Sequence, residues 1–209
     1  MRKQLKVLLI NGSPHKNGTT FTALSEAERI LKAEGIETEI LHIGTSVKGC
    51  MVCLGCKDGG GCVIKDSVNE AAEKLKAADG VIVGSPVYYA SPNGSLVAFL
   101  DRLFFSSKFD KTMKVGAAVV CARRGGCTAS FDVINKYFSI SGMPIVTSSY
   151  WNQVHGSNGE DAAFDEEGMQ TMRNLARNMA FMIKSISLGK EKYGLPEKES
   201  AAKTNFIRR

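Results

Sequence analysis

The sequence predicts an α/β protein built on a doubly wound parallel sheet with helices on both faces. Five short apolar segments alternate with segments that have helical spacing of apolar residues. Several of the short segments are almost continuously hydrophobic, which is typical of strands buried on both faces, as the strands of a parallel sheet are. Glycine, serine and proline follow the first and third of them. These observations together favour one sheet covered on each side by helices.

The expected strands, in chain order, are residues 5–11, 36–43, 80–85, 115–121 and 144–148. The second alternates partly between apolar and polar residues and is expected at an edge of the sheet. The expected helices are residues 19–34, 67–78, a segment starting at Asn93 or Ser95, 128–140 and about 166–187. Gly35 is expected to end the first helix, and Asn93 or Ser95 to cap the third. In such sheets ligands bind beyond the carboxyl ends of the strands, where the loops after strands one, three and four meet.

Residues 1–209 are expected to form a single domain, because this length suits one ordinary α/β domain. Residues 44–65 show no periodicity and contain four cysteines, so they are expected to form a cysteine-rich insertion loop. A polar C-terminal tail is expected from about residue 188. We find neither an internal repeat nor a linker between domains.

The net charge of +6 arises from basic residues gathered at the two ends of the chain. A nucleic-acid groove would instead interleave basic and aromatic residues on one element, so we expect no nucleic-acid partner. No apolar run approaches the roughly 20 residues needed to cross a bilayer, and the basic start precedes too short an apolar run for a signal peptide. We therefore expect a cytoplasmic protein without a membrane partner.

The first strand runs into the loop Gly12-Ser13-Pro14-His15-Lys16-Asn17-Gly18-Thr19-Thr20, which opens a helix. The positive end of a helix attracts anions, hydroxyl groups add donors, and glycines allow a close backbone approach. Neither the dinucleotide pattern G-x-G-x-x-G nor the mononucleotide P-loop is present. The loop favours a phosphate monoester held mainly by neutral donors, and an ordinary helix cap is the alternative.

Three motifs follow one another along the chain: Asn11–Pro14 with Gly18–Thr20, then Gly84–Tyr89, then Arg124–Gly126. In this order they resemble the NADPH-dependent FMN reductase family of flavodoxin-like proteins, and above all its iron–sulfur flavoprotein branch. The resemblance runs from about residue 5 to residue 187. It implies a three-layer flavodoxin-like fold with a five-stranded parallel sheet, FMN as the cofactor, NAD(P)H as co-substrate, and a homodimer or homotetramer with the flavin near the subunit interface.

The resemblance also assigns residues to each part of FMN. The phosphate would be held by residues of the first loop, namely Ser13, Gly18, Thr19 and Thr20, with His15 and Asn17 beside it. The isoalloxazine ring would lie along Pro86, Val87, Tyr88, Tyr89 and Ala90, and Arg124, Gly125 and Gly126 would close its pyrimidine end. Aromatic residues in a strand-end loop can cover a planar ring, and packing of both tyrosines under the next helix is the alternative. The flavin carries the chemistry, so no catalytic side chain is assigned.

The cysteines of the insertion loop, Cys50, Cys53, Cys56 and Cys62, are separated by two, two and five residues. Short gaps let thiolates converge on one centre, and four thiolates can hold zinc or an iron–sulfur cluster. The compact spacing resembles the motif of iron–sulfur flavoproteins. A [4Fe–4S] cluster is the first interpretation, with free or redox-active thiols and zinc left open. Cys121 and Cys127 are expected to be buried as small hydrophobic residues.

The resemblance implies an FMN-dependent oxidoreductase that takes electrons from NAD(P)H and passes them to an acceptor: a quinone, a nitro compound, a metal ion or a redox protein. One alternative is an electron carrier with a [4Fe–4S] cluster that is reduced by ferredoxin, and another is a thiol- or metal-sensing protein. Arg123 and Arg124 either bind the nicotinamide phosphate or form an exposed pair. Trp151, Asn152 and His155 either cover a neighbouring subunit's flavin or form a fixed surface loop.

Overall fold

A computed structural model describes residues 4–200 and residue 202. The described residues form a six-stranded sheet of β1 (Lys6–Asn11), β2 (Glu37–His42), β3 (Gly80–Tyr88), β4 (Ser91–Pro92), β5 (Val115–Ala122) and β6 (Gln153–His155). The parallel strands lie in the order β2-β1-β3-β5-β6, and β4 pairs antiparallel with β3. The order of strands reverses between β1 and β3, which is where sheets of this kind bind ligands.

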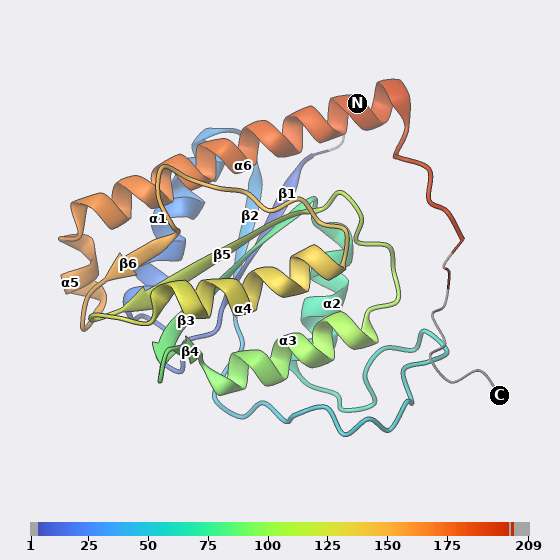
Figure 1. Ribbon diagram of the computed structural model, residues 1–209, viewed down its shortest axis with the longest axis horizontal. Helices are drawn as coiled ribbons and strands as arrows, with labels where there is room; N and C mark the ends of the chain where they lie inside the picture. Colours follow the sequence, from blue (N-terminus) through green and yellow to red (C-terminus); the bar gives the residue numbers. More distant parts are fainter. Residues whose placement is uncertain (1–3, 201, 203–209) are drawn as a thin grey trace.

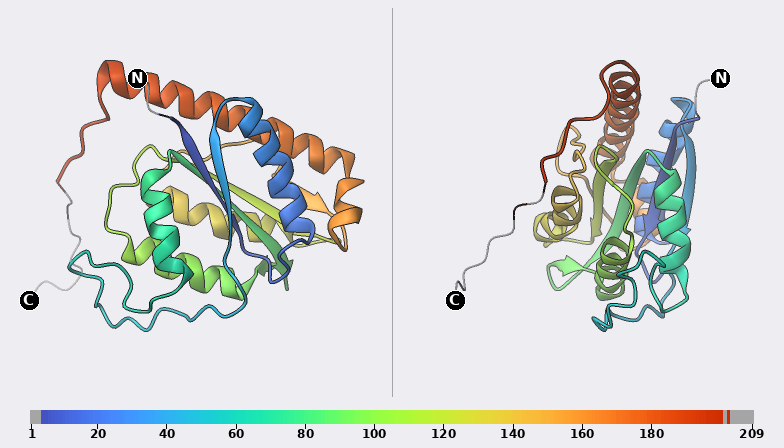
Figure 2. Two further views of the ribbon diagram at one scale, coloured as in Figure 1. Left: turned by 180° about the vertical axis from the view of Figure 1, so that it is seen from behind. Right: turned by 90° about the vertical axis from the view of Figure 1, so that its right-hand side faces the viewer.

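The helices are α1 (Thr19–Ala33), α2 (Ser67–Ala77), α3 (Gly94–Ser106), α4 (Cys127–Ile140), α5 (Gly159–Ala163) and α6 (Glu166–Tyr193). Helices α1 and α6 cover one face of the sheet, and α2, α3 and α4 cover the other (Figures 1 and 2). The predicted three-layer architecture, with a parallel sheet between two helical layers, is therefore confirmed.

Each face of the sheet has its own apolar core because successive side chains of a strand point to opposite sides. Leu9 and Ile82 pack with the α1 and α6 side, whereas Leu8 and Val81 pack with the other three helices. All four side chains are buried. Burial of each is worth on the order of 1.5–3 kcal/mol, so the central strands are fixed firmly and the loops at their carboxyl ends start from fixed positions.

The predicted strand at 144–148 is wrong in its position. Only an isolated parallel bridge joins Ile145 to Gly116, and the fifth parallel strand is β6, further along the chain. Between them the buried side chain of Asn152 takes over the sheet's hydrogen bonding, since its Nδ2 donates to the Ala118 carbonyl at 3.0 Å. The chain therefore leaves the sheet after Val146 and returns at β6.

Other boundaries also differ from the prediction. Helix α6 continues to Tyr193, beyond the expected end at about 187, while the short elements β4 and α5 were not expected. Asn93, not Ser95, caps α3. Residues 44–65 contain neither helix nor strand, as predicted. Within the described ranges, no helix is long and apolar enough to cross a membrane.

Candidate functional site

The three predicted loops meet at the carboxyl edge of the sheet. The amide of Gly12 donates to the Gly84 carbonyl at 2.9 Å, which joins the loop of residues 12–20 to the end of β3. A Cβ atom on Gly12 would lie 2.7 Å from Leu96 Cδ2, so this close approach requires glycine. On the other side, Pro86 is in register with Cys121 of β5. The predicted convergence is confirmed.

The loop of residues 12–20 is shaped by the side chains of Asn11 and His42, to which the sequence analysis assigned no role. Asn11 Oδ1 accepts a hydrogen bond from the Ser13 amide at 3.0 Å, and Asn11 Nδ2 donates to the Lys16 carbonyl at 3.1 Å. His42, at the end of β2, donates from Nε2 to the Ser13 carbonyl at 2.8 Å. The sequence feature that could have revealed them is a polar residue at the carboxyl end of a strand: Asn11 ends β1 and His42 ends β2. These bonds connect the loop to the carboxyl ends of β1 and β2.

Helix α1 begins at this loop with Gly18 as its N-cap, and no side chain of the described residues caps its first turn. No side chain therefore competes with an anion for the amides at this helix end. The Thr19 hydroxyl donates to the Asn158 carbonyl at 3.0 Å. The Thr20 hydroxyl is buried near the Cys121 thiol and has no hydrogen bond of ordinary geometry to any described group.

Burial raises the pKa of the Cys121 thiol to about 12, and the nearby Thr20 opposes this only in part. Cys127 is also buried, and burial raises the pKa of its thiol. Both thiols stay neutral at physiological pH, so the prediction that these cysteines act as small buried hydrophobic residues is confirmed.

Residues 86–90 comprise the half-buried to exposed end of β3 and the exposed two-residue turn that leads to β4. Its turn residues Tyr89 and Ala90 have φ angles of 50° and 57°, the left-handed conformation that a two-residue type I′ turn requires. Each costs about 1–2 kcal/mol relative to glycine, and such strain is concentrated at functional sites. Tyr88 is 44% exposed and Tyr89 fully exposed, so packing of both rings under the next helix is excluded.

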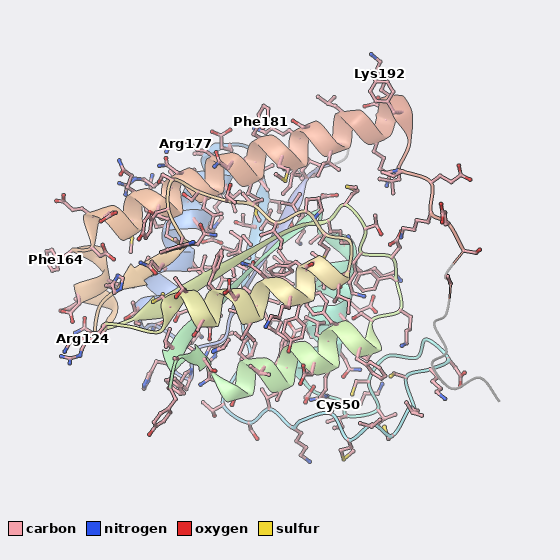
Figure 3. All side chains as sticks on the ribbon, viewed as in Figure 1. Cys50, Arg124, Phe164, Arg177, Phe181 and Lys192 are labelled. Carbon is pink, nitrogen blue, oxygen red and sulfur yellow. The ribbon has the colours of Figure 1, made fainter. Side chains whose placement is uncertain are left out.

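The arginine turn after β5 lies against this hairpin. Gly126 begins α4 with a φ of 95°, and a Cβ atom there would lie 2.8 Å from Val87 Cγ1 and 2.9 Å from Ala90 Cα. Arg123 and Arg124 are exposed, and Figure 3 shows Arg124 at the end of β5. In the part of the chain that the structure describes, no side chain caps α4 either. The edge therefore joins two uncapped helix ends, an aromatic hairpin and two exposed cations.

Residues 48–66, here called the cysteine loop, lie below α3 (Figure 3, Cys50). All four predicted cysteines line one narrow cavity of about 20 Å³, together with Arg102 and Phe105 of α3. Cys56 is buried and Cys62 half-buried, whereas Cys50 and Cys53 are exposed. Among residues 4–200 and 202, no three His, Cys, Asp or Glu side chains lie close enough together to hold a metal ion as they stand.

Two features suit the cysteine loop to a bulky thiolate-bound group nonetheless. Val52 and Leu54, on either side of Cys53, have φ angles of 52° and 61°, so the backbone is strained where the exposed thiols are carried. Four thiols around one cavity are also the donor set that a [4Fe–4S] cluster uses. The four cysteines fit such a cluster in kind, because all of them line the same cavity.

The cysteine loop is attached to α3 by Arg102, a residue that the sequence analysis missed. Its guanidinium is buried and pairs with Asp66 at 2.7 Å. Burial opposes ionisation of Asp66, yet Arg102 and the Val68 amide together hold its pKa below the ordinary value. The available signal was an arginine in the apolar stripe of a helix, between Phe99 and Leu103.

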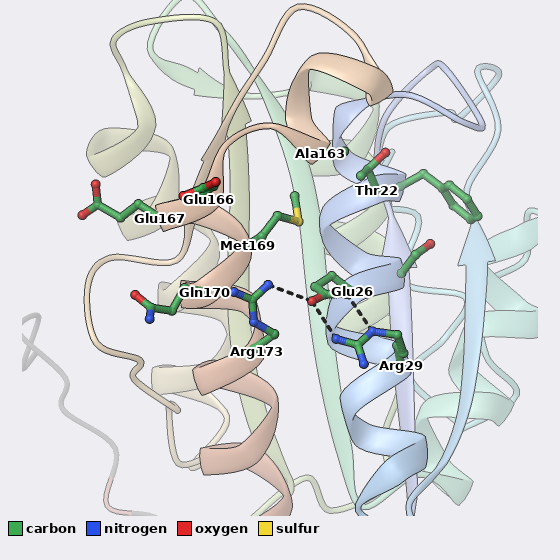
Figure 4. Close-up of a pocket in the computed structure, with 11 residues that line it drawn as sticks. Thr22, Glu26, Arg29, Ala163, Glu166, Glu167, Met169, Gln170 and Arg173 are labelled. Atoms are coloured by element: carbon green, nitrogen blue, oxygen red, sulfur yellow. Dashed lines mark hydrogen bonds and ion pairs between the residues drawn. The ribbon is translucent and has the colours of Figure 1, made fainter.

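A separate groove of about 1000 Å³ lies between α1 and α6 (Figure 4). In it Glu26 stands between Arg29 and Arg173, with ion pairs of 2.9 and 3.0 Å. The two arginines hold the pKa of Glu26 below its ordinary value, against the effect of burial. None of the residues predicted to hold FMN lines this groove. The groove is therefore separate from the candidate site.

Known proteins similar to this chain point to one family. Residues 5–157 match the NADPH-dependent FMN reductase family. An iron–sulfur flavoprotein of Methanocaldococcus jannaschii is 35% identical over 191 residues, covering 87% of this chain and 99% of that protein. One of Methanosarcina thermophila is 32% identical over 193 residues, covering 90% and 100%.

The fold is shared more widely. The structure of a flavodoxin from the domain Archaea superposes with a TM-score of 0.60 at 16% identity, covering 86% of this chain and 99% of that one. With its family match and its two similar relatives, this flavodoxin-like chain belongs to the NADPH-dependent FMN reductase family, in the branch of the iron–sulfur flavoproteins.

Proposed function

We propose that this flavoprotein is an FMN-dependent oxidoreductase that takes electrons from NAD(P)H and passes them to an acceptor. The observation that supports it most is the meeting of three family motifs at one edge of the sheet. Gly12 is hydrogen-bonded to Gly84, and Gly126 packs against the hairpin at Val87 and Ala90. One molecule can therefore contact all three loops.

The residues fit FMN by their chemistry. The uncapped first turn of α1 suits the phosphate. The exposed rings of Tyr88 and Tyr89 suit a planar isoalloxazine, and the turn of Arg124, Gly125 and Gly126 closes the same end of the site. When bound, FMN supplies hydride acceptance and the release of single electrons.

The two arginines of the turn give the site a role in choosing its electron donor. Arg123 and Arg124 are exposed at the edge where the three loops meet. Two positive charges beside an open site raise the local concentration of an anionic co-substrate. We expect them to favour a nicotinamide nucleotide with an extra phosphate. Replacing both with alanine should raise the Michaelis constant for NADPH more than that for NADH. If both Michaelis constants changed by the same factor, the arginines would have no role in choosing the donor.

A second candidate is an electron carrier with a [4Fe–4S] cluster on Cys50, Cys53, Cys56 and Cys62, reduced by ferredoxin instead of NAD(P)H. The cavity that all four cysteines line favours it. Helix α3 joins the two sites, because its cap Asn93 follows the hairpin directly and Arg102 touches the cysteine loop. These residues are nine positions apart, a rise of about 14 Å at 1.5 Å per residue.

One experiment separates the two candidates. Protein purified without oxygen is analysed for FMN and iron, then mixed in a stopped-flow instrument with NADPH, NADH or reduced ferredoxin while flavin absorbance is followed. We expect about one FMN per chain and rapid bleaching by NADPH or NADH. Bleaching by ferredoxin alone would favour the carrier. A protein that binds no FMN at micromolar concentration would contradict both.

We also propose that the chain assembles as a homodimer or homotetramer. Trp151 is exposed just before the edge strand β6, and His155 is half-buried at the end of that strand, so both are candidates to cover a neighbouring flavin. Asn152 is not available for that role, because it is buried and bonded to Ala118. Light scattering gives the oligomeric state. If Trp151 covers a flavin, Trp151→Ala should change flavin fluorescence in the oligomer.

A further inference from the structure

We propose that Arg102 is the positioning residue of the cysteine loop, and that its hydrogen bonds to Cys62 set the reduction potential of the cluster held there. This inference rests on the cluster proposed above. Arg102 lies on α3 and is 1% exposed, with Phe99 and Leu103 of the same helix buried beside it. A charge buried this deeply is stable only when it is paired and hydrogen-bonded.

The five N–H groups of the Arg102 guanidinium make six hydrogen-bond contacts, one N–H of Nη2 being shared, and all six reach the cysteine loop. Nε and Nη2 both donate to Cys62 Sγ at 3.3 Å. Nη1 and Nη2 donate to the Asp66 carboxylate at 2.7 and 3.0 Å. The remaining bonds reach the Lys48 carbonyl at 3.2 Å and the Ile64 carbonyl at 3.0 Å. One side chain therefore connects the start, the last cysteine and the end of the loop to a single helix.

The pattern of donors explains why arginine stands at this position. A guanidinium is a planar fork with several fixed N–H directions, so it can serve a sulfur atom and a carboxylate together. A lysine ammonium is a compact charge on a flexible stem and cannot hold both partners in this geometry. Asp66 needs the same guanidinium, since it also caps α2 through the Val68 amide at 3.1 Å. The position of Cys62 is thereby coupled to the start of α2.

The contact with Cys62 has a redox consequence that simple packing would not have. Hydrogen bonds to the sulfur ligands and nearby positive charge stabilise the more negative, reduced state of an iron–sulfur cluster. Arg102 supplies both, through two N–H groups on one sulfur and through its charge. Weakening these bonds should lower the reduction potential.

The test compares Arg102→Lys and Arg102→Met with Arg173→Lys in the full-length protein purified without oxygen. The control changes an arginine that pairs with Glu26 at 3.0 Å on the far side of the sheet. FMN, iron and the midpoint potential are measured. We expect Arg102→Lys to keep FMN and iron but to lower the midpoint potential of the cluster by about 59 mV. For one electron this corresponds to about a tenfold change in the ratio of oxidised to reduced cluster at a fixed solution potential. Arg102→Met should lose most of its iron, and Arg173→Lys should match the wild type.

A wild-type potential and iron content in both Arg102 variants would overturn the inference. A second measurement covers the case in which the wild type itself holds no iron, which would contradict the proposed cluster. Hydrogen exchange of residues 48–66 in iron-free protein then decides whether Arg102 positions the loop. Exchange at Cys62 and Ile64 should accelerate several-fold in Arg102→Lys, while β1 and β3 stay protected. Unchanged exchange would overturn the positioning role as well.

Discussion

The loops at the carboxyl edge of the sheet and the cysteine loop are held by different means. The edge loops begin where buried strands end, and contacts made at those strand ends fix them, such as the backbone bond between Gly12 and Gly84 and the side-chain bonds of Asn11. The cysteine loop belongs to no strand and depends on the side chains of Arg102 and Asp66. The edge should therefore be sensitive to added volume at glycine, and the cysteine loop to the loss of a charge. The comparison would be wrong if added volume at the edge glycines had no effect, or if loss of the charged pair left the cysteine loop unchanged.

The largest effect is expected from Gly126→Ala. The new Cβ atom would meet Val87 Cγ1 at 2.8 Å and Ala90 Cα at 2.9 Å, in a backbone with a φ of 95°. Strain in the left-handed region and overpacking add to about 3–4 kcal/mol of destabilisation. FMN binding should be lost as well, because the turn and the hairpin move apart. Urea unfolding and flavin titration measure the two effects.

Gly125→Ala is the matched control. A Cβ atom at Gly125 would have no other heavy atom within 4 Å outside its chain neighbours. Its stability should stay within about 0.5 kcal/mol of the wild type, as for other surface substitutions. Equal stabilities of the two variants would show that the contact between the turn and the hairpin does not hold the edge together.

The second effect concerns the cysteine loop. Asp66→Asn keeps an oxygen that can cap α2 but leaves the buried charge of Arg102 without its carboxylate. Removing one partner of a buried ion pair costs about 3–5 kcal/mol, and the 24% exposure of the Asp66 side chain reduces this to about 2 kcal/mol. Affinity for FMN should not change, because the edge loops do not depend on this pair. A loss of FMN affinity in parallel with stability would contradict that independence.

The same pair should make the stability of the cysteine loop sensitive to acid. The pKa of Asp66 is lower in the folded state than its ordinary value of 3.8. Its contribution is therefore complete above about pH 5 and is lost as the pH falls through the folded-state pKa, below 3.8. The difference in unfolding free energy between wild type and Asp66→Asn should shrink in this acid range. A difference that does not change with pH would assign the effect of Asp66→Asn to packing.

The edge could be predicted from the sequence because its position is inherited from the sheet. Near-continuous apolar runs locate β1, β3 and β5, parallel strands place their ends at one edge, and the motifs follow directly. Glycine at residues 12 and 126 reports a close backbone approach that the structure contains. Here local pattern and global fold agree, so the convergence of the three loops did not require coordinates.

What could not be predicted depends on single side chains that act over a long distance in the sequence. Arg102 reaches Cys62 across 40 residues, and Asn152 reaches Ala118 across 34. No periodicity encodes such a contact. Asn152 also explains the misplaced fifth strand, since a side chain there substitutes for strand backbone and an apolar run at 144–148 gives no sign of it.

The smallest effect should come from Tyr89→Asn, and it tests whether the edge gives up stability in favour of ligand binding. Tyr89 is fully exposed, so its ring contributes little to packing, while its φ of 50° strains the backbone. Asparagine tolerates this conformation better, and unfolding experiments should show a gain of about 0.5–1 kcal/mol.

If the ring covers the flavin, the same substitution should weaken FMN binding up to about tenfold, the value of one aromatic contact. Ala90→Gly relieves the neighbouring strain, at a φ of 57°, without removing a ring, and should gain stability with FMN affinity unchanged. If Tyr89→Asn raises stability but weakens FMN binding, and Ala90→Gly raises stability without changing binding, then the strained turn serves to present the aromatic ring to the flavin. Loss of both would mean that Tyr89 supports the fold itself.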